Sequence, residues 1–389
     1  MQIDDLQKAL CDENLDGWLF FDHHQRDPLA YRILKLQPVH AATRRWYYFV
    51  PAHGEPQGLV HAIESHMLNG LPGAIRKYSS WPAQVEGLKR LLAGCRRIAM
   101  QYSPNCAIPQ ISLVDAGTLE LVRATGVEVV SSANLVQTFE ARWTADQLEM
   151  HLEAGRRVDR VRGEAFQQIG AALAAGRTIT EWEVNRFIRD GFQKSGLVTD
   201  HGPIVAVNAN MSDPHYEPAA ERSCPIRNRD AVLIDMWAKL DRPGAVYYDI
   251  TWTGYCGATP PSALQNVFEV VRDARDRAIT RVQSAVAQRQ IIHGFEVDDA
   301  ARAYIKEKGY GEYFIHRTGH SIGEDVHGAG ANMDNLETHD ERRLIAGTCF
   351  SIEPGVYLPE FGIRSEVNVY VGSSDAQVTG EVQRNLVVI

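Results

Sequence analysis

Cysteine is scarce in this chain, and its six residues lie far apart without a Cys-x-x-Cys pair. That spacing argues against a zinc ribbon and against a thioredoxin-type redox motif, and it favours free thiols in a reducing cytoplasm. Long apolar runs are lacking as well, since no stretch approaches the ~20 apolar residues that cross a bilayer. The first residues lack a basic region followed by an apolar run, which argues against a secretory signal. The sequence therefore predicts a cytoplasmic protein with no membrane partner.

Positive charge is also in short supply. The 40 Lys and Arg residues are outnumbered by 49 Asp and Glu residues, which gives a net charge of -9. This average field repels polyanions, and no dense Lys/Arg stripe offsets it, so we expect no nucleic-acid partner. A neutral or cationic small substrate is more compatible with the charge.

The length of 389 residues is large for a single core, because domains of ~100–200 residues are usual. We expect a boundary near Arg142-Trp143, with one domain over residues 1–142 and a second over 143–389. The first domain alternates helical and extended periodicity, which is typical of an α/β domain, and it carries no catalytic motif. Its predicted helices are Ile3–Leu10 and Trp81–Leu92, and its predicted strands are Gly17–Phe21, Arg45–Val50 and Arg97–Gln101.

The second half reads as α+β, with helices grouped against an antiparallel sheet. Thr144 with Gln147, and Thr180 with Glu183, have the spacing that caps a helix N-terminus. We therefore expect helices that end near Gly176 and Ile188, and further helices over 262–285 and 297–306. The expected strands are 202–207, 231–237, 247–253, 348–352 and 362–370.

Two aspartates interrupt apolar strands on either side of a strong turn sequence, Asp241-Arg-Pro-Gly244. A hairpin centred near Arg242 would place Asp235 and Asp249 directly opposite each other on one face. Two carboxylates held so close repel each other and raise a pKa. A bound cation would remove that penalty.

Two glutamates repeat the pattern downstream. Glu353 ends the apolar run Cys349-Phe-Ser-Ile, and Glu366 lies within Gly362–Tyr370. A buried carboxylate without a partner costs several kcal/mol, so such groups are protonated, paired or bound to metal. Any one of the four acids is readily explained as exposed or salt-bridged, whereas four together favour a metal site.

Histidines complete the candidate site. His316, His320 and His327 lie in one glycine-punctuated segment, and His215 lies in a loop before the first aspartate strand. A lone histidine is more often structural than a ligand, but three in one such segment are typical of a site.

With these residues the second half resembles the pita-bread metallopeptidases, which include methionine aminopeptidase, aminopeptidase P, prolidase and creatinase. Five motifs match in order, and the first half is similar, more loosely, to the creatinase-type accessory domain of prolidases and aminopeptidases P. The resemblance implies a pita-bread fold over 143–389, a peptide substrate and a homodimer. The matching motifs are Leu233-Ile-Asp, Asp249-Ile-Thr-Trp-Thr, the run from His316 to His327, Ser351-Ile-Glu-Pro-Gly and Gly362-Ile-Arg-Ser-Glu.

The same resemblance implies two divalent metal ions with five ligands: Asp235, Asp249, His320, Glu353 and Glu366. Asp249 and Glu366 would bridge the ions. Oxygen ligands with one imidazole favour Mn²⁺ and leave Co²⁺, Zn²⁺ or Fe²⁺ as alternatives. A water shared by the ions would be the nucleophile.

By the same resemblance Glu353 would also shuttle a proton to the leaving amine. His215 and His327 would orient the substrate and stabilise the tetrahedral intermediate. His316 and Arg364 would lie near the substrate, and Thr251 beside the metals.

Two features depart from the family pattern: Trp252 stands where arginine is common, and the loop between the two aspartates is longer than usual. Both are expected beside the substrate pocket. The leading hypothesis is an Xaa-Pro peptidase, either a prolidase-like dipeptidase or an aminopeptidase P. A metal-dependent hydrolase of a non-peptide C–N bond is the first alternative, and a non-catalytic peptide-binding module is the second.

Overall fold

The protein is described by a computed structural model that covers residues 3–37 and 42–389. The chain divides into two compact units, Met1–Glu140 (unit 1) and Ala141–Ile389 (unit 2). Among the described residues no helix combines the length and apolar character needed to cross a bilayer.

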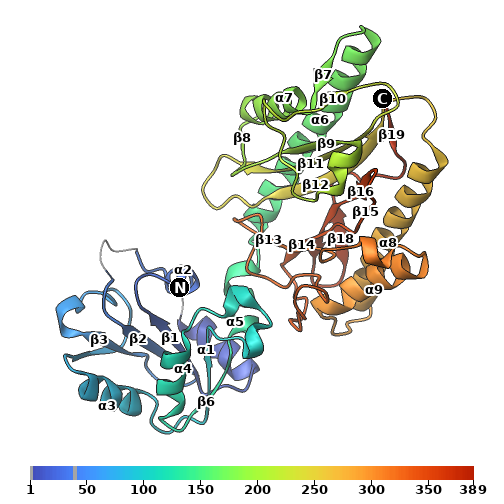
Figure 1. Ribbon diagram of the computed structural model, residues 1–389. Coiled ribbons are helices and arrows are strands. Elements are labelled where there is room, and N and C mark those ends of the chain that lie inside the picture. The colour runs from blue at the N-terminus through green and yellow to red at the C-terminus, as the bar shows by residue number, and fades with distance from the viewer. Residues whose placement is uncertain (1–2, 38–41) are drawn as a thin grey trace. The chain divides into compact units, whose positions relative to one another are not determined.

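Unit 1 is built on a six-stranded mixed sheet with the strand order β4-β3-β2-β1-β5-β6 (Figure 1). Strands β1 and β2 are buried along almost their whole length, as their continuous apolar sequences require. The predicted helices and strands of this half are confirmed, with ends that differ by one or two residues. The elements are α1 Ile3–Asp12, β1 Gly17–Asp22, α2 Pro28–Leu34, β2 Trp46–Pro51, β3 Gln57–His61, β4 Ala74–Tyr78, α3 Trp81–Leu91, β5 Arg97–Met100, α4 Ala116–Arg123, β6 Glu128–Ser131 and α5 Ala133–Val136.

The helices of unit 2 begin where the capping residues predict. Thr144 and Gln147 form a reciprocal cap at the start of α6, and Thr180 and Glu183 do the same for α7. Helix α7 continues six residues past the predicted end at Ile188. The helices are α6 Ala145–Ala174, α7 Glu181–Lys194, α8 Ser262–Ala287 and α9 Gly294–Glu307.

Two sheets lie between these helices. The first has the order β19-β12-β11-β8, with β9 also on β11, and it is antiparallel except for β19. The second has the order β13-β14-β17-β18. The strands are β7 Ile179–Thr180, β8 Leu197–Val198, β9 Ile204–Val207, β10 Pro225–Ile226, β11 Ala231–Leu240, β12 Tyr248–Tyr255, β13 Ser321–Ile322, β14 Cys349–Ile352, β15 Gly355–Tyr357, β16 Gly362–Arg364, β17 Val367–Val371, β18 Ala376–Thr379 and β19 Val387–Val388.

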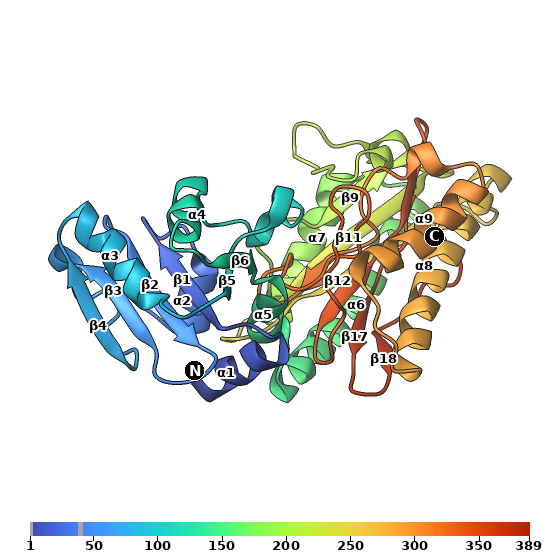
Figure 2. The same cartoon turned by 90° about the horizontal axis from the view of Figure 1, so that it is seen from below.

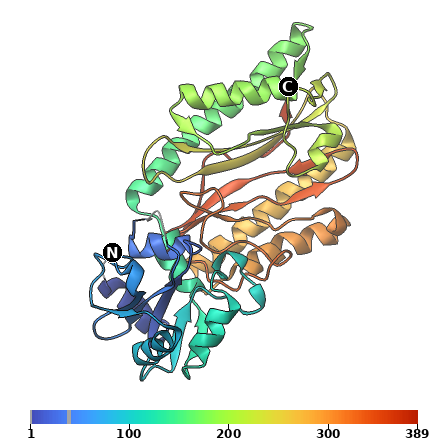
Figure 3. The same cartoon turned by 60° about the vertical axis from the view of Figure 1, so that its left-hand side comes forward.

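Helices cover the outer face of each sheet. The green helix α6 lies along β11 and β12, and α7 lies against β8 and β9 (Figures 2 and 3). Helix α8 lies against the red strands of the second sheet, and α9 packs on α8. The inner faces of the two sheets therefore meet in the middle of unit 2.

The expected strand Gly362–Tyr370 is interrupted, and this corrects the prediction of one continuous strand. Residues 362–364 pair with β15, and residues from Val367 onward pair with β14. At the break Ser365 accepts a hydrogen bond from the buried Arg275 (2.7 Å), and the Glu366 N–H donates to the Thr251 carbonyl (3.1 Å). The break thereby joins the second sheet to β12 at the position of Glu366.

Candidate metal centre

The hairpin of β11 and β12 presents its acids to the seam between the two sheets. Asp235 pairs with Thr251 and Asp249 pairs with Trp237, so the two aspartates are diagonal neighbours and do not lie directly opposite as predicted. The turn is centred one residue later than expected, which shifts the register by two. A shift of two preserves the face of a strand, so both carboxylates still point to the same side.

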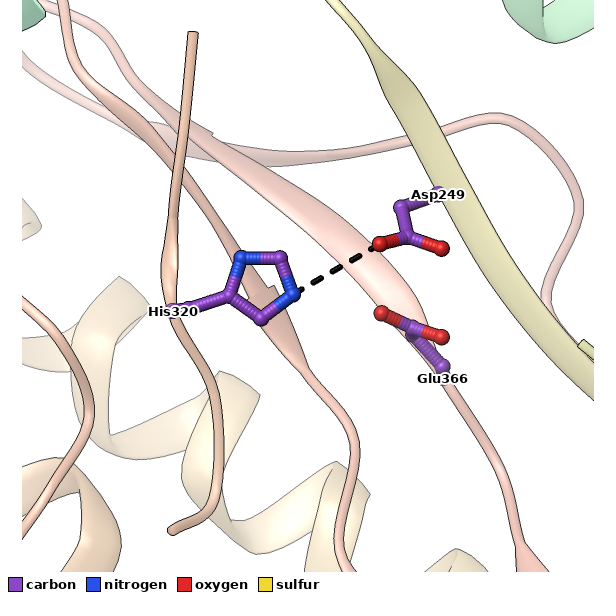
Figure 4. A group of neighbouring side chains, drawn as sticks. All are labelled: Asp249, His320 and Glu366. Atoms are coloured by element: carbon purple, nitrogen blue, oxygen red, sulfur yellow. Dashed lines mark ion pairs between the residues drawn. The ribbon is translucent and has the colours of Figure 1, made fainter. Parts of the chain in front are cut away.

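Three of the five predicted ligands converge tightly. One ligand atom from each of Asp249, His320 and Glu366 lies within 4.8 Å of the others, and all three residues are buried. Figure 4 shows the Asp249 and Glu366 carboxylates side by side, with the imidazole of His320 facing them. Asp249 comes from β12, Glu366 follows β16, and His320 precedes β13.

The orientation of His320 leaves a lone pair facing the acids. Its Nδ1 lies 3.1 Å from the Ser321 carbonyl, which can accept only an N–H, so Nε2 is the unprotonated nitrogen of the neutral ring. Burial lowers the pKa of His320 and favours this neutral form. Nε2 lies 3.5 Å from Asp249 Oδ2 and 3.4 Å from Glu353 Oε1. A carbonyl on one ring nitrogen is a common arrangement for a metal-binding histidine.

Three of the carboxylates each have one oxygen without a hydrogen-bond partner. Asp235 Oδ1, Asp249 Oδ1 and Glu366 Oε1 are buried and accept no hydrogen bond. Such orphaned acceptors are costly in a protein interior. Burial, and then the charges of neighbouring acids, raise the pKa values of Asp249 and Glu366 well above their ordinary range. Oxygen atoms with lone pairs, negative charge and no donor fit a divalent cation.

Asp235 lies beside Arg364, which is itself buried. The guanidinium donates to Asp235 Oδ2 (2.5 Å), to the Thr251 hydroxyl (3.0 Å) and to the Tyr357 hydroxyl (3.0 Å). Thr251 in turn donates to Glu366 Oε2 (2.8 Å). Arg364 thus orients two predicted ligands, directly and through Thr251, and its donors already have protein acceptors. The predicted place of Thr251 beside the metal ligands agrees with these contacts.

Glu353 lies on the rim of the same group and is partly exposed. Its Oε1 accepts a hydrogen bond from Ser351 (3.1 Å), and its Oε2 is 3.9 Å from the Arg364 guanidinium. Burial raises the pKa of this carboxyl. Glu353 therefore faces both the histidine and the solvent-accessible space.

His316 is held through a chain that leads to Arg364. Its Nδ1 donates to the Arg317 carbonyl (2.7 Å), and its Nε2 accepts from the Tyr357 hydroxyl (2.7 Å). Burial, and then the charge of Arg364, lower the pKa of His316 to about 3, so the ring is neutral. Burial raises the pKa of Tyr357 to about 12, so the phenol keeps its proton.

A cavity of about 460 Å³ opens onto these groups. His215 and His327, predicted to contact substrate, both line it and are both solvent-exposed. The ring of His327 lies 4.3 Å from that of His320, and the repulsion between two protonated rings lowers the pKa of His327. All predicted site residues therefore border one cavity: Asp235, Asp249, His320, Glu353, Glu366, His215, His316, His327 and Arg364.

The two departures from the family pattern lie elsewhere, which corrects their expected placement beside the pocket. Trp252 alternates with Thr251 and Thr253 along β12, so it points to the opposite face of the sheet. There it packs against the core beneath α6, with the guanidinium of Arg162 3.6 Å from the centre of its ring. The loop 241–247 contributes no residue to the described cavity lining.

Sequence reasoning missed three residues that border or hold the site. Trp237 lies on the same strand face as Asp235, directly across from Asp249, and its ring forms a wall of the cavity. Its position two residues after Asp235 was the signal for this placement. His201 contacts the Trp237 ring edge-on, and Tyr357 links His316 to Arg364. The sequence carries no local signal for the last two.

The residue before His320 must be glycine because the backbone of β14 lies very close to it. A Cβ at this position would lie 1.9 Å from the Ser351 carbonyl oxygen of β14. Because only glycine permits this approach, the His320 N–H can reach the Ser351 hydroxyl (2.9 Å). The glycine thus sets the distance between the histidine and the Glu353 strand.

Comparison with known sequences finds related proteins. The model of metallopeptidase family M24 matches residues 149–373. An Xaa-Pro dipeptidase of Pyrococcus furiosus is 30% identical over 226 residues, which are 56% of this chain and 59% of that enzyme. An Xaa-Pro dipeptidase of Lactobacillus helveticus is 34% identical over 175 residues, which are 45% of this chain and 43% of that enzyme. The sequence matches thus span about half the length of these relatives.

Solved structures match the whole chain. Dipeptidase PepE of Mycobacterium ulcerans aligns with a TM-score of 0.69 at 23% identity, over 100% of this chain and 96% of that one. A dipeptidase of Pyrococcus horikoshii aligns with a TM-score of 0.63 at 25% identity, over 100% of both chains. The predicted pita-bread fold of the second half, preceded by an α/β half, is confirmed.

Proposed function

This chain belongs to metallopeptidase family M24, and on that premise we propose that it hydrolyses Xaa-Pro peptide bonds, as a prolidase-like dipeptidase or an aminopeptidase P. The proposal rests on the names of the relatives and on one observation. Asp235, Asp249 and Glu366 each keep one buried carboxylate oxygen without a partner. The unprotonated nitrogen of His320 faces Asp249, and these two residues and Glu366 bring ligand atoms within 4.8 Å of one another. An arrangement so unfavourable without a cation is what a metal centre requires.

Family membership implies divalent metal ions, and we propose two, held by Asp235, Asp249, His320, Glu353 and Glu366. Manganese fits this oxygen-rich set, with Co²⁺, Zn²⁺ or Fe²⁺ as alternatives. When bound, the ions would supply Lewis acidity and an activated water at neutral pH.

The remaining residues have separate tasks. Hydrolysis adds water across a C–N bond, so the leaving amine must gain a proton, and Glu353 lies at the cavity where it can deliver one. His215 and His327 border the same space as donors for the substrate carbonyl. Arg364, Thr251 and Tyr357 hold the carboxylates and His316 in position.

A substrate panel with each divalent metal tests this proposal. We expect proline release from Xaa-Pro dipeptides or longer Xaa-Pro peptides, loss of that release after chelation, and recovery with Mn²⁺. The variant Asp249→Asn should lose both bound metal and activity, whereas Asp299→Asn, an exposed control, should retain both. A folded protein that releases no proline with any metal would refute the proposal. Hydrolysis of non-peptide C–N substrates alone would favour the first alternative, and metal-free peptide binding the second.

Three further predictions belong to this proposal. Residues 1–142 would be a creatinase-type accessory domain, and residues 143–389 would be the catalytic domain. The protein would form a homodimer, which light scattering tests. It would be located in the cytoplasm, which cell fractionation tests.

A further inference from the structure

A second hollow, of about 510 Å³, lies in unit 1 and has a different chemistry. Three arginines line it: Arg26, Arg44 and Arg45. All of its lining residues belong to unit 1, whereas those of the candidate metal centre belong to unit 2. The hollow is therefore built from unit 1 alone.

The positive charge of this hollow is only partly offset by carboxylates: the charge of Arg44 helps to lower the pKa of Glu64, and that of Arg45 helps to lower the pKa of Asp115. None of the three guanidinium groups forms an ion pair with a described carboxylate, and Arg44 donates to the neutral Thr43 hydroxyl (2.8 Å). One carboxylate, Asp115, does line the hollow. It accepts the Thr118 N–H (2.9 Å) and hydroxyl (2.8 Å), which leaves an excess of positive charge.

The backbone that carries Arg44 and Arg45 is held in place by hydrogen bonds to Glu64. The buried carboxylate of Glu64 accepts the N–H groups of Thr43 and Arg44, both at 3.0 Å, and the Thr43 hydroxyl at 2.6 Å. Glu64 is thus occupied by backbone and hydroxyl donors. Arg44 and Arg45 are presented on a segment whose position is set before any ligand arrives.

Other donors face the same space. His61 accepts the Ile63 N–H on Nδ1 (3.2 Å), so its neutral ring carries a proton on Nε2. The eleven-residue helix α3 begins here, with Ser80 as its N-cap. Pro82 has no N–H, and the Ala83 N–H donates to the Ser80 hydroxyl (3.4 Å), so this helix contributes mainly the positive end of its dipole.

An aromatic ring stands at the rim. Trp81 lines the hollow, and its side chain is 75% exposed, the largest fraction among the exposed apolar residues of the described chain. An exposed tryptophan beside a polar pocket is typical of a surface that stacks on a planar ligand group.

We propose that this hollow binds a small anion of the phosphate class, with Trp81 against a planar group attached to the phosphate. Three guanidinium groups offer more positive charge and more donors than the single lining carboxylate can satisfy. A phosphate, with about two negative charges and three acceptor oxygens, matches that supply.

Calorimetry on the metal-loaded full chain tests the site with phenyl phosphate, inorganic phosphate and benzoate. We expect saturable binding of both phosphates that weakens as salt increases. Phenyl phosphate should bind several-fold more tightly than inorganic phosphate, and benzoate more weakly than either. Arg45→Gln and Arg44→Gln should each weaken phosphate binding about tenfold, since each removes a charge-assisted hydrogen bond. Trp81→Phe should reduce the advantage of the phenyl group and leave inorganic phosphate unchanged.

Arg76→Gln, an exposed substitution on β4 outside the hollow, is the matched control and should leave binding unchanged. Thermal unfolding confirms that each variant is folded. Absence of saturable phosphate binding would overturn the proposal. Binding that is equal in the wild type and both hollow variants would also overturn it, because the anion would then lie elsewhere, such as at the metal centre.

Discussion

Unit 2 contains two kinds of buried acid. Asp298, fully buried on α9, accepts five hydrogen bonds, from Arg302, Thr318 and the Asn335 N–H. Glu181, fully buried at the start of α7, accepts four, from donors on four segments. In the candidate metal centre Asp235, Asp249 and Glu366 are buried to a similar degree, yet each has an oxygen without any donor.

The difference separates acids whose hydrogen bonds support the fold from acids that fit the proposed metal site. Burial alone does not, because both kinds are removed from solvent. The number of donors does, because a structural carboxylate is stabilised by its hydrogen bonds, whereas a ligand must keep a lone pair available. Substitutions in the first kind should lower stability, and those in the second should lower activity.

The largest effect is expected for Glu353→Gln. The substitution removes a carboxylate that lines the cavity and keeps its shape, so kcat/KM for Xaa-Pro peptides should fall about 10²–10⁴-fold. Thermal unfolding should show that the variant is folded. Metal analysis measures how much metal the variant retains. Activity within a few-fold of wild type, with the metal retained, would exclude a catalytic role for Glu353.

Asp298→Ala tests the opposite member of the comparison. It deletes an acceptor of five hydrogen bonds and leaves the Arg302 guanidinium without its carboxylate, so the free energy of unfolding should fall by about 3–5 kcal/mol. Urea denaturation measures this loss. The neighbouring Asp299 is exposed, and Asp299→Ala should have little effect. Equal losses in the two variants would contradict a structural role for the hydrogen bonds that Asp298 accepts.

His151 extends the comparison to a buried ring with both nitrogens satisfied. It contacts the Tyr247 carbonyl and the Thr379 hydroxyl, both at 2.7 Å, and burial lowers its pKa from 6.5 to about 4. Because the folded pKa is the lower one, the neutral ring contributes its full stability above pH 6.5. That stability, about 3 kcal/mol, is lost as the pH falls from 6.5 towards 4. His151→Gln should remove this part of the pH dependence of the free energy of unfolding. The prediction would be contradicted if that free energy changed with pH in the same way in the variant and the wild type.

The smallest effect is expected for Glu366→Gln. It distinguishes repulsion between Glu366 and its neighbouring acids in the metal-free protein from binding of a metal ion by Glu366. Burial and neighbouring acids raise its pKa in the folded protein, so stability falls as the pH rises above 4.5, where the unfolded acid ionises. Glu366→Gln should therefore stabilise the metal-free protein at neutral pH by about 1–2 kcal/mol, and the gain should vanish near pH 4.5. With Mn²⁺ present the wild type should be the more stable protein. Thermal unfolding with and without chelator measures the stability of the two proteins in each state. If the variant were the more stable protein in both states, this would argue against metal binding by Glu366.

Local sequence predicted the elements of the fold well. The two capping pairs and the apolar periodicity located α6 and α7, because these signals act within a few residues. Element ends and strand pairing were less certain. The hairpin register was wrong by two residues, and the break between β16 and β17 was missed, because both depend on contacts with distant segments.

The site shows the same division. Alternation along a strand was enough to predict that Asp235 and Asp249 share a face, and it places Trp252 on the other face once it is applied to that residue. The roles of Tyr357 and Arg364 depend on hydrogen bonds between residues up to 129 positions apart. No local pattern carries that information.

By itself the sequence determined which residues could serve as ligands, and on which face of each strand they lie, because chemistry and the two-residue strand period are local properties. Only the tertiary structure decided which acids have donors and which do not. It did so by placing β12 against the break after β16. There Thr251 donates to one oxygen of Glu366, and Arg364 donates to one oxygen of Asp235. The other oxygen of each acid has no donor. Hydrogen-bond satisfaction depends on where every neighbouring element is placed, and this requires the folded chain.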